Sequence, residues 1–179
     1  MQKSEQLTKV SIRLVSDPPL MSEKKLNSPD AAVELLGDYI AQMDREVLCV
    51  LNFNNVLQPI NCNVVSIGTI NSSVAAPREI MKSAVLSNAS YMMIMHNHPS
   101  GNLTPSRDDI KITQRMIDAC EIMGIPLLDH IIVGPRGKDF FSLKEKKTIE
   151  FGLQKKYQTD MDFIKFNTDP KVAEWNKSR

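Results

Sequence analysis

The sequence predicts an α/β protein in which a mixed β-sheet has helices packed on it. Apolar residues recur at helical spacing in three separate segments, and short apolar runs of strand length lie between them. After an initial hairpin, strands and helices alternate along the chain, which favours helices packed on a sheet. The 179 residues, 42% hydrophobic and 24% charged, suffice for one globular domain with a core of ordinary size.

The first half of the domain is predicted to be a helix followed by a hairpin. Ser28 is expected to be the N-cap of the helix, with Pro29 at the first helical position. The segment "REVLCVLNFNNVLQPINCNVVSIG" predicts two strands around a turn at Asn54 and Asn55. Further upstream, "VSIRLV" has the composition of a strand and precedes a loop with a Pro-Pro break.

The second half alternates between helices and strands. "PREIMKSAVLSN" predicts a helix with Pro77 near its start and Asn88 as its C-terminal cap. "YMMIMH" is a short apolar strand that leads into two histidines, and a long helix is expected over roughly 105–123, with Thr104 as N-cap and Gly124 at its end. "PLLDHIIVG" and "DFFSL" are the last two predicted strands.

Three segments of the chain differ in composition. Residues 1–27 are interpreted as an N-terminal lead-in and residues 28–143 as the domain. Residues 144–179 are more polar and less regular, and we expect a C-terminal extension with one helix and a tail.

The net charge and the cysteine content restrict the expected binding partners and the expected cellular compartment of the protein. The net charge of +1 gives no global reason to expect nucleic acid or an anionic membrane as a partner. Cys49 and Cys120 lie in apolar patterns and are expected to be buried, reduced thiols, and Cys62 completes no C-x-x-C pair. The longest apolar runs, about five residues, fall far short of the ~20 that a membrane helix needs. We therefore expect a cytoplasmic protein without a membrane partner.

The segment "MHNHPSGNLTPSRDD" carries the functional signal. Side chains alternate along a strand, so His96 and His98 point the same way, with Cα atoms about 6.5–7 Å apart. The following loop and helix start lead the chain back, so that Asp109 can approach both imidazoles. Two histidines, one aspartate and a water form a catalytic zinc set with an open fourth position.

Other interpretations of these residues remain open on the pattern alone. Ser106 and Asp109 also match a capping box, in which both would serve only helix stability. Considered with the H-x-H pair, the metal interpretation is the better one. His130 lies in an apolar strand and is interpreted as structural or as support for a ligand rather than as a ligand itself. Asn97 is expected to point away from the two histidines.

The spacing of His96, His98, Ser106 and Asp109 resembles the JAMM motif of JAB/MPN-domain metalloproteases. Together with "VSIGTINSSVAAPREI" upstream and "GIPLLDHIIVG" downstream, the run "HNHPSGNLTPSRDD" resembles the RadC family of that superfamily. The resemblance covers roughly residues 28–143. It implies an α/β fold of the cytidine-deaminase-like kind and a Zn²⁺ ion held by His96, His98 and Asp109.

The resemblance also assigns two catalytic roles. The family motif requires a glutamate on the first core strand, and Glu46 in "DREVLCVLNF" matches it. Its carboxylate would hydrogen-bond the zinc-bound water and act as general base, and Ser106 would hydrogen-bond the developing oxyanion. Without the motif, Glu46 would be interpreted as a solvated charge at the start of a strand.

These residues favour a zinc-dependent hydrolase that cleaves an amide or isopeptide bond in a peptide or protein. The same metal site could act on a phosphodiester, because activated water does not itself choose the electrophile. The alternative is a RadC-type accessory protein of DNA repair or mobile elements that acts on or near DNA. RadC proteins usually carry an N-terminal helix-hairpin-helix module, which residues 1–27 are too few to form. A deaminase is disfavoured, since the H-x-E and P-C-x-x-C signatures are absent.

Overall fold

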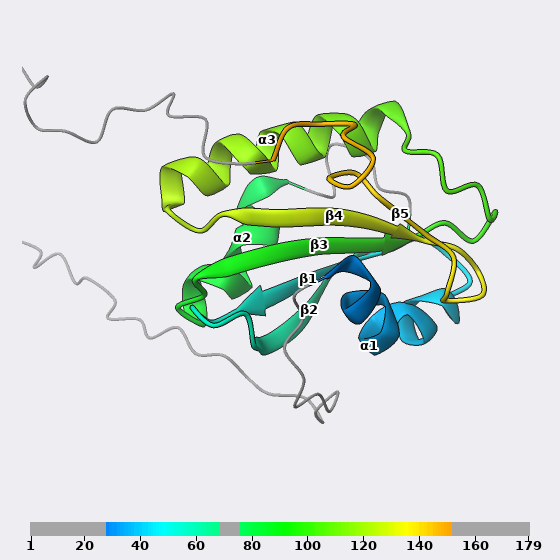
Figure 1. Cartoon of the computed structure of the whole chain (residues 1–179), viewed down its shortest axis with the longest axis horizontal. Helices are drawn as coiled ribbons and strands as arrows, with labels where there is room; N and C mark the ends of the chain where they lie inside the picture. Colours follow the sequence, from blue (N-terminus) through cyan, green and yellow to red (C-terminus); the bar gives the residue numbers. More distant parts are fainter. Residues whose placement is uncertain (1–27, 69–75, 152–179) are drawn as a thin grey trace, which may run out of the picture.

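The computed structural model describes residues 28–68 and 76–151. In this part of the chain the elements are α1 (Pro29–Ala41), β1 (Val47–Phe53), β2 (Pro59–Ile67), α2 (Pro77–Leu86), β3 (Tyr91–Asn97), α3 (Arg107–Met123), β4 (Leu127–Val133) and β5 (Phe140–Ser142) (Figure 1). The five strands form one sheet in the order β2-β1-β3-β4-β5. β3 and β4 are parallel, and the other neighbouring strands are antiparallel. The prediction of a mixed sheet with helices packed on it is confirmed.

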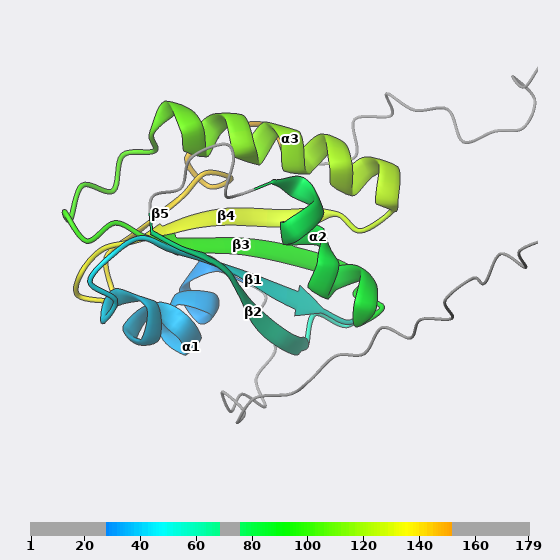
Figure 2. The ribbon, with the colours of Figure 1, turned by 180° about the vertical axis from the view of Figure 1, so that it is seen from behind.

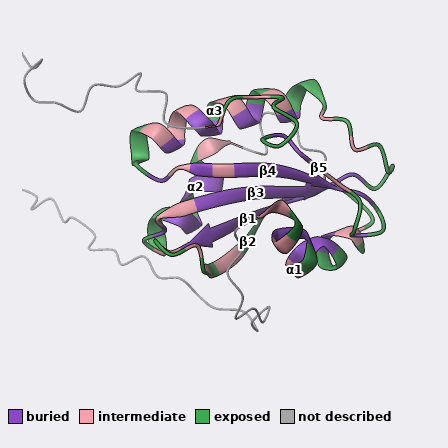
Figure 3. Ribbon diagram, viewed as in Figure 1, coloured by how far each residue is buried: buried purple, intermediate pink, exposed green. Residues whose placement is uncertain are grey.

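Helices cover both faces of the sheet. α1 lies on one face, whereas α2 and α3 lie on the other, as the two opposite views show (Figures 1 and 2). Side chains of β1 alternate between the two cores: Val47 and Cys49 face α1, and Leu48 and Val50 face α2 and α3. The central strands are consequently buried along their length (Figure 3).

Local signals place the first two helices and the hairpin as predicted. The Ser28 hydroxyl accepts a hydrogen bond from the Ala31 amide at 3.2 Å, directly before the proline that opens α1. In the turn between β1 and β2, the Asn54 side chain accepts from the amides of Val56 and Gln58, each at 3.0 Å. The C-cap of α2 is Ser87 rather than the predicted Asn88, which follows it in the left-handed conformation with φ of 50°.

The start of α3 differs from the prediction. The N-cap is Ser106 and not Thr104, and the helix begins at Arg107. The Thr104 amide instead donates to the Asn102 side chain at 3.0 Å, so this threonine belongs to the preceding turn. The capping box of Ser106 and Asp109 satisfies two backbone donors at once, which favours the later start.

Other predictions concern the ends of the chain and the cysteines. The strand expected at "VSIRLV" and most of the C-terminal extension lie outside the described residues. Cys49 and Cys120 are buried free thiols, as expected. None of the helices within residues 28–68 and 76–151 combines the length and the hydropathy of a membrane-spanning segment.

A close backbone contact holds α1 against the turn between β4 and β5. A Cβ atom added at Gly37 would lie 2.1 Å from the Gly137 carbonyl oxygen. Within a helix, alanine normally stabilises by ~1 kcal/mol relative to glycine. We nevertheless expect Gly37→Ala to lower the free energy of unfolding by about 1–3 kcal/mol, because α1 must move away from the turn.

Urea denaturation of the metal-free protein measures this effect. Gly124→Ala is the control: its new methyl group meets no described atom within 4 Å, although φ is +66° there. This control should cost about 1 kcal/mol through backbone strain alone. A Gly37→Ala protein more stable than the wild type would contradict the observed packing of α1.

Candidate metal centre

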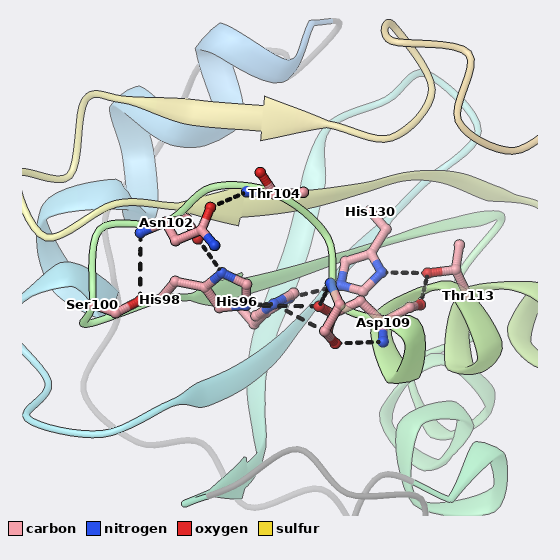
Figure 4. Close-up of polar contacts among 9 residues, drawn as sticks. His96, His98, Ser100, Asn102, Thr104, Asp109, Thr113 and His130 are labelled. Atoms are coloured by element: carbon pink, nitrogen blue, oxygen red, sulfur yellow. Dashed lines mark hydrogen bonds and ion pairs between the residues drawn. The ribbon is translucent and has the colours of Figure 1, made fainter.

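The candidate centre lies where β3 ends and α3 begins. His96 is on β3, His98 follows the last residue of that strand, and Asp109 is in the first turn of α3 (Figure 4). β3, α3 and β4 form a parallel β-α-β unit, and sites of open α/β sheets lie at the carboxyl ends of such strands. The fold thereby brings together residues separated by a Pro- and Gly-containing loop.

The three side chains converge closely. The Nε2 atoms of His96 and His98 are 3.0 Å apart, and the Asp109 carboxylate oxygens lie 3.3 Å from His96 Nε2 and 3.7 Å from His98 Nε2. One ligand atom from each residue lies within 4.8 Å of the others. All three residues are buried, with 0%, 8% and 2% of their surface exposed.

The chemistry of this donor set fits a cation. His98 Nδ1 lies 2.6 Å from the Asn102 carbonyl oxygen, which can only accept, so Nδ1 carries a proton and Nε2 is the ring atom placed to bind a cation. Burial, and then the neighbouring His98, lower the pKa of His96 to about 3, so this imidazole is neutral near pH 7. Two imidazoles and a carboxylate thus face one point, the ligand types that Zn²⁺ takes.

Capping and metal binding are compatible at Asp109. Its amide donates to the Ser106 hydroxyl at 3.1 Å, and its Oδ2 accepts from the Ser106 amide at 2.7 Å. This capping box leaves Oδ1 directed at His96. The two interpretations of the Ser-x-x-Asp pattern are therefore parts of one arrangement, in which the cap holds the carboxylate in place.

His130 and Thr113 lie behind His96. His130 Nε2 is 2.8 Å from His96 Nδ1, and its Nδ1 is 2.5 Å from the Thr113 hydroxyl (Figure 4). His130 thus contacts a candidate ligand without belonging to the ligand group. Thr113 was not predicted as a site residue. The sequence does place this threonine on the apolar face of the predicted helix, and a hydroxyl buried there needs a hydrogen-bond partner.

The backbone of Glu46 lies next to the centre on the neighbouring strand. Leu48 of β1 pairs with His96 of β3 in antiparallel register, and Glu46 lies two residues before Leu48, towards the end of β3 that carries His98. Glu46 is half-buried and directly precedes β1. It is not one of the three residues whose ligand atoms converge.

The side chain of Asn97 holds both neighbours of Glu46. Its Oδ1 accepts from the Val47 amide at 2.7 Å, and its Nδ2 donates to the Arg45 carbonyl at 3.1 Å. Asn97 points away from the two histidines, as strand alternation predicted. This amide therefore connects the strand of the histidines to the segment that carries Glu46.

We expect Asn97→Ala to destabilise the protein by about 1–3 kcal/mol, since it leaves a buried backbone amide without its partner. Urea denaturation of the metal-free protein measures the loss. Asn63→Ala, an exposed site on β2, is the control and should stay within about 0.5 kcal/mol of the wild type. Equal stability of the two variants would show that the Asn97 bonds add nothing to folding.

Comparison with known proteins agrees with this architecture. A mixed sheet with a buried His-His-Asp group at the end of a central strand is consistent with a JAB-type domain. Residues 26–148 match the family model described as the RadC-like JAB domain, and the chain belongs to this family.

Curated relatives carry the name UPF0758 protein. The one from Desulforamulus reducens is 42% identical over 137 residues, which are 76% of this chain and 60% of that protein. The one from Caldanaerobacter subterraneus is 39% identical over 127 residues, 70% of this chain and 53% of that protein. The chain thus spans little more than half the length of these relatives.

Proposed function

We propose that this protein is a zinc-dependent hydrolase of the JAMM type that cleaves an amide or isopeptide bond in a peptide or protein. The observation that carries the proposal is the buried convergence of His96, His98 and Asp109. Three protein ligands of this kind leave a coordination position open, which is typical of catalytic and not of structural zinc sites.

The residues around the centre supply the remaining chemistry. When bound, Zn²⁺ would polarise the scissile carbonyl and activate water for attack. Glu46 would accept the proton of the attacking water and deliver it to the leaving amine. This role is supported by the position of Glu46 directly before β1, two residues from Leu48, which pairs with His96.

Ser106 is suited to donate to the developing oxyanion. Its oxygen accepts the capping bond from the Asp109 amide, which uses one lone pair. The hydroxyl proton remains available as a donor. Ser106 is exposed at the start of α3, where a substrate can approach it.

An open depression lies beside the loop that follows His98, and its lining does not include His96, His98 or Asp109. It has a volume of about 560 Å³ and lies between Gly101 and Leu103 of that loop and the turn between β4 and β5. Asn102 of the same loop holds His98 through its carbonyl oxygen. A polypeptide bound in this depression would contact the loop that positions His98 and not the metal position itself.

Metal analysis combined with substrate assays tests the proposal. We expect about one equivalent of zinc per chain, together with cleavage of peptide or isopeptide-linked substrates that a chelator abolishes and added zinc restores. Less than about a tenth of an equivalent, without recovery on adding zinc, would overturn the metal site. Cleavage of DNA phosphodiesters in place of amides would overturn the reaction class.

A further inference from the structure

A chain of hydrogen bonds connects Asp109 to His96 through the protein interior. The Thr113 hydroxyl lies 2.6 Å from the Asp109 backbone carbonyl and 2.5 Å from His130 Nδ1. His130 Nε2 in turn lies 2.8 Å from His96 Nδ1. We name this series, shown in Figure 4, the Thr113–His130–His96 relay.

The backbone carbonyl fixes the direction of every proton in the relay. A carbonyl cannot donate, so the single hydroxyl proton of Thr113 points to Asp109. The Thr113 oxygen must then accept from His130, which places a proton on His130 Nδ1. In a neutral imidazole the other nitrogen is bare, so His130 Nε2 accepts from the Nδ1–H of His96.

We propose that His130 is a positioning residue that holds His96 in its Nδ1–H tautomer, so that the His96 Nε2 lone pair faces the metal position. In the opposite tautomer, His96 Nε2 would carry a proton directed at Asp109 and could not bind a metal. This inference rests on the proposed metal site and adds residues that tune it.

The buried contacts on the Nδ1 side of His96 favour this proton order, and a cation at the metal position would satisfy its Nε2, which lies 3.0 Å from His98 Nε2 and 3.3 Å from Asp109 Oδ1. Thr113, His130 and His96 are each 0% exposed, so solvent does not compete for their hydrogen bonds. The strand register places His130 of β4 next to Ile94 of β3, which brings its ring beside that of His96. Asp109 contacts both ends of the relay. Its backbone carbonyl accepts from Thr113, and its carboxylate lies next to the Nε2 atom of His96.

Nitrogen-15 NMR of the metal-free protein near pH 7 tests the tautomer directly. Long-range correlations distinguish a protonated from a bare ring nitrogen, and we expect His96 and His130 both to carry the proton on Nδ1. Thr113→Val removes the anchoring hydroxyl at nearly constant shape, and we expect the opposite His96 tautomer to appear. Thr113→Ser keeps the hydroxyl and should keep the wild-type pattern. A wild-type His96 with its proton on Nε2 would overturn the inference.

Zinc affinity measured with a competing chelator provides the second readout. Supporting partners of metal ligands typically contribute 10–100-fold in affinity, so we expect Thr113→Val and His130→Phe to bind zinc about 10–100-fold more weakly. Thr113→Ser and His130→Gln, which retain a hydroxyl and an acceptor respectively, should recover most of this loss. Circular dichroism and urea denaturation confirm that each variant is folded.

The zinc-binding and NMR results distinguish failure of the relay from failure of the proposed zinc-dependent function. Unchanged zinc affinity in folded Thr113→Val and His130→Phe would overturn the positioning role while leaving the metal site intact. Absence of zinc binding in the wild type, with the expected His96 tautomer, would overturn the proposed function and support the proton order of the relay.

Discussion

Replacement of Asp109 by Asn is expected to reduce bound zinc from about one equivalent to less than about a tenth. The amide oxygen of Asn can still take part in the helix cap, so the start of α3 should persist. The negative charge beside His96 and His98 is lost, and two imidazoles alone would have to hold a divalent cation. The measurement is metal content after dialysis, with thermal unfolding in the presence and absence of zinc.

Asp108→Asn is the matched control for this experiment. Asp108 precedes Asp109 in the same helical turn, is exposed, and pairs with Lys111 on the surface. At 100 times the dissociation constant, zinc should stabilise the wild type and this control by about 2.7 kcal/mol, and should leave Asp109→Asn unchanged. Equal zinc content in Asp108→Asn and Asp109→Asn would remove Asp109 from the ligand set.

Glu46→Gln is expected to lower kcat for amide hydrolysis by about 10²–10⁴-fold, the usual contribution of a general base. Zinc content should stay at the wild-type level, because Glu46 lies outside the converging ligand group. The two results together distinguish proton transfer from metal binding. Steady-state kinetics with a cleavable peptide and metal analysis of the same samples supply both numbers.

Asp44→Asn is the control for Glu46→Gln. Asp44 lies two residues upstream, is exposed, and pairs with Arg45, so its loss should leave kcat within about twofold of the wild type. Unchanged kcat in Glu46→Gln would exclude the general-base role. Loss of zinc from Glu46→Gln would indicate that this carboxylate binds the metal.

Local patterns predicted most of the fold because the signals for these elements are short-range. The cap at Ser28, the turn at Asn54 and the left-handed Asn88 each depend on residues within a few positions. The predicted N-cap of α3 was wrong by two residues because Thr104 and Ser106 are both residue types that suit an N-cap. The capping box and the hydrogen bond of the Thr104 amide to Asn102 decided between them.

By itself, the sequence determined the candidate ligands. Strand alternation puts His96 and His98 on one side, and the loop and helix start return Asp109 to them, all within 14 consecutive residues. It also determined the strand that Glu46 precedes. These features follow from local geometry, which a short segment specifies.

The tertiary structure alone decided how these ligands are held. His130 reaches His96 only because β4 pairs in parallel with β3, and Thr113 reaches His130 only because α3 packs over that pair. The contact of Asn97 with the amide of Val47 spans 50 positions and depends on the register of β1 with β3. Strand order and register arise from packing of the whole sheet, which a local pattern does not specify.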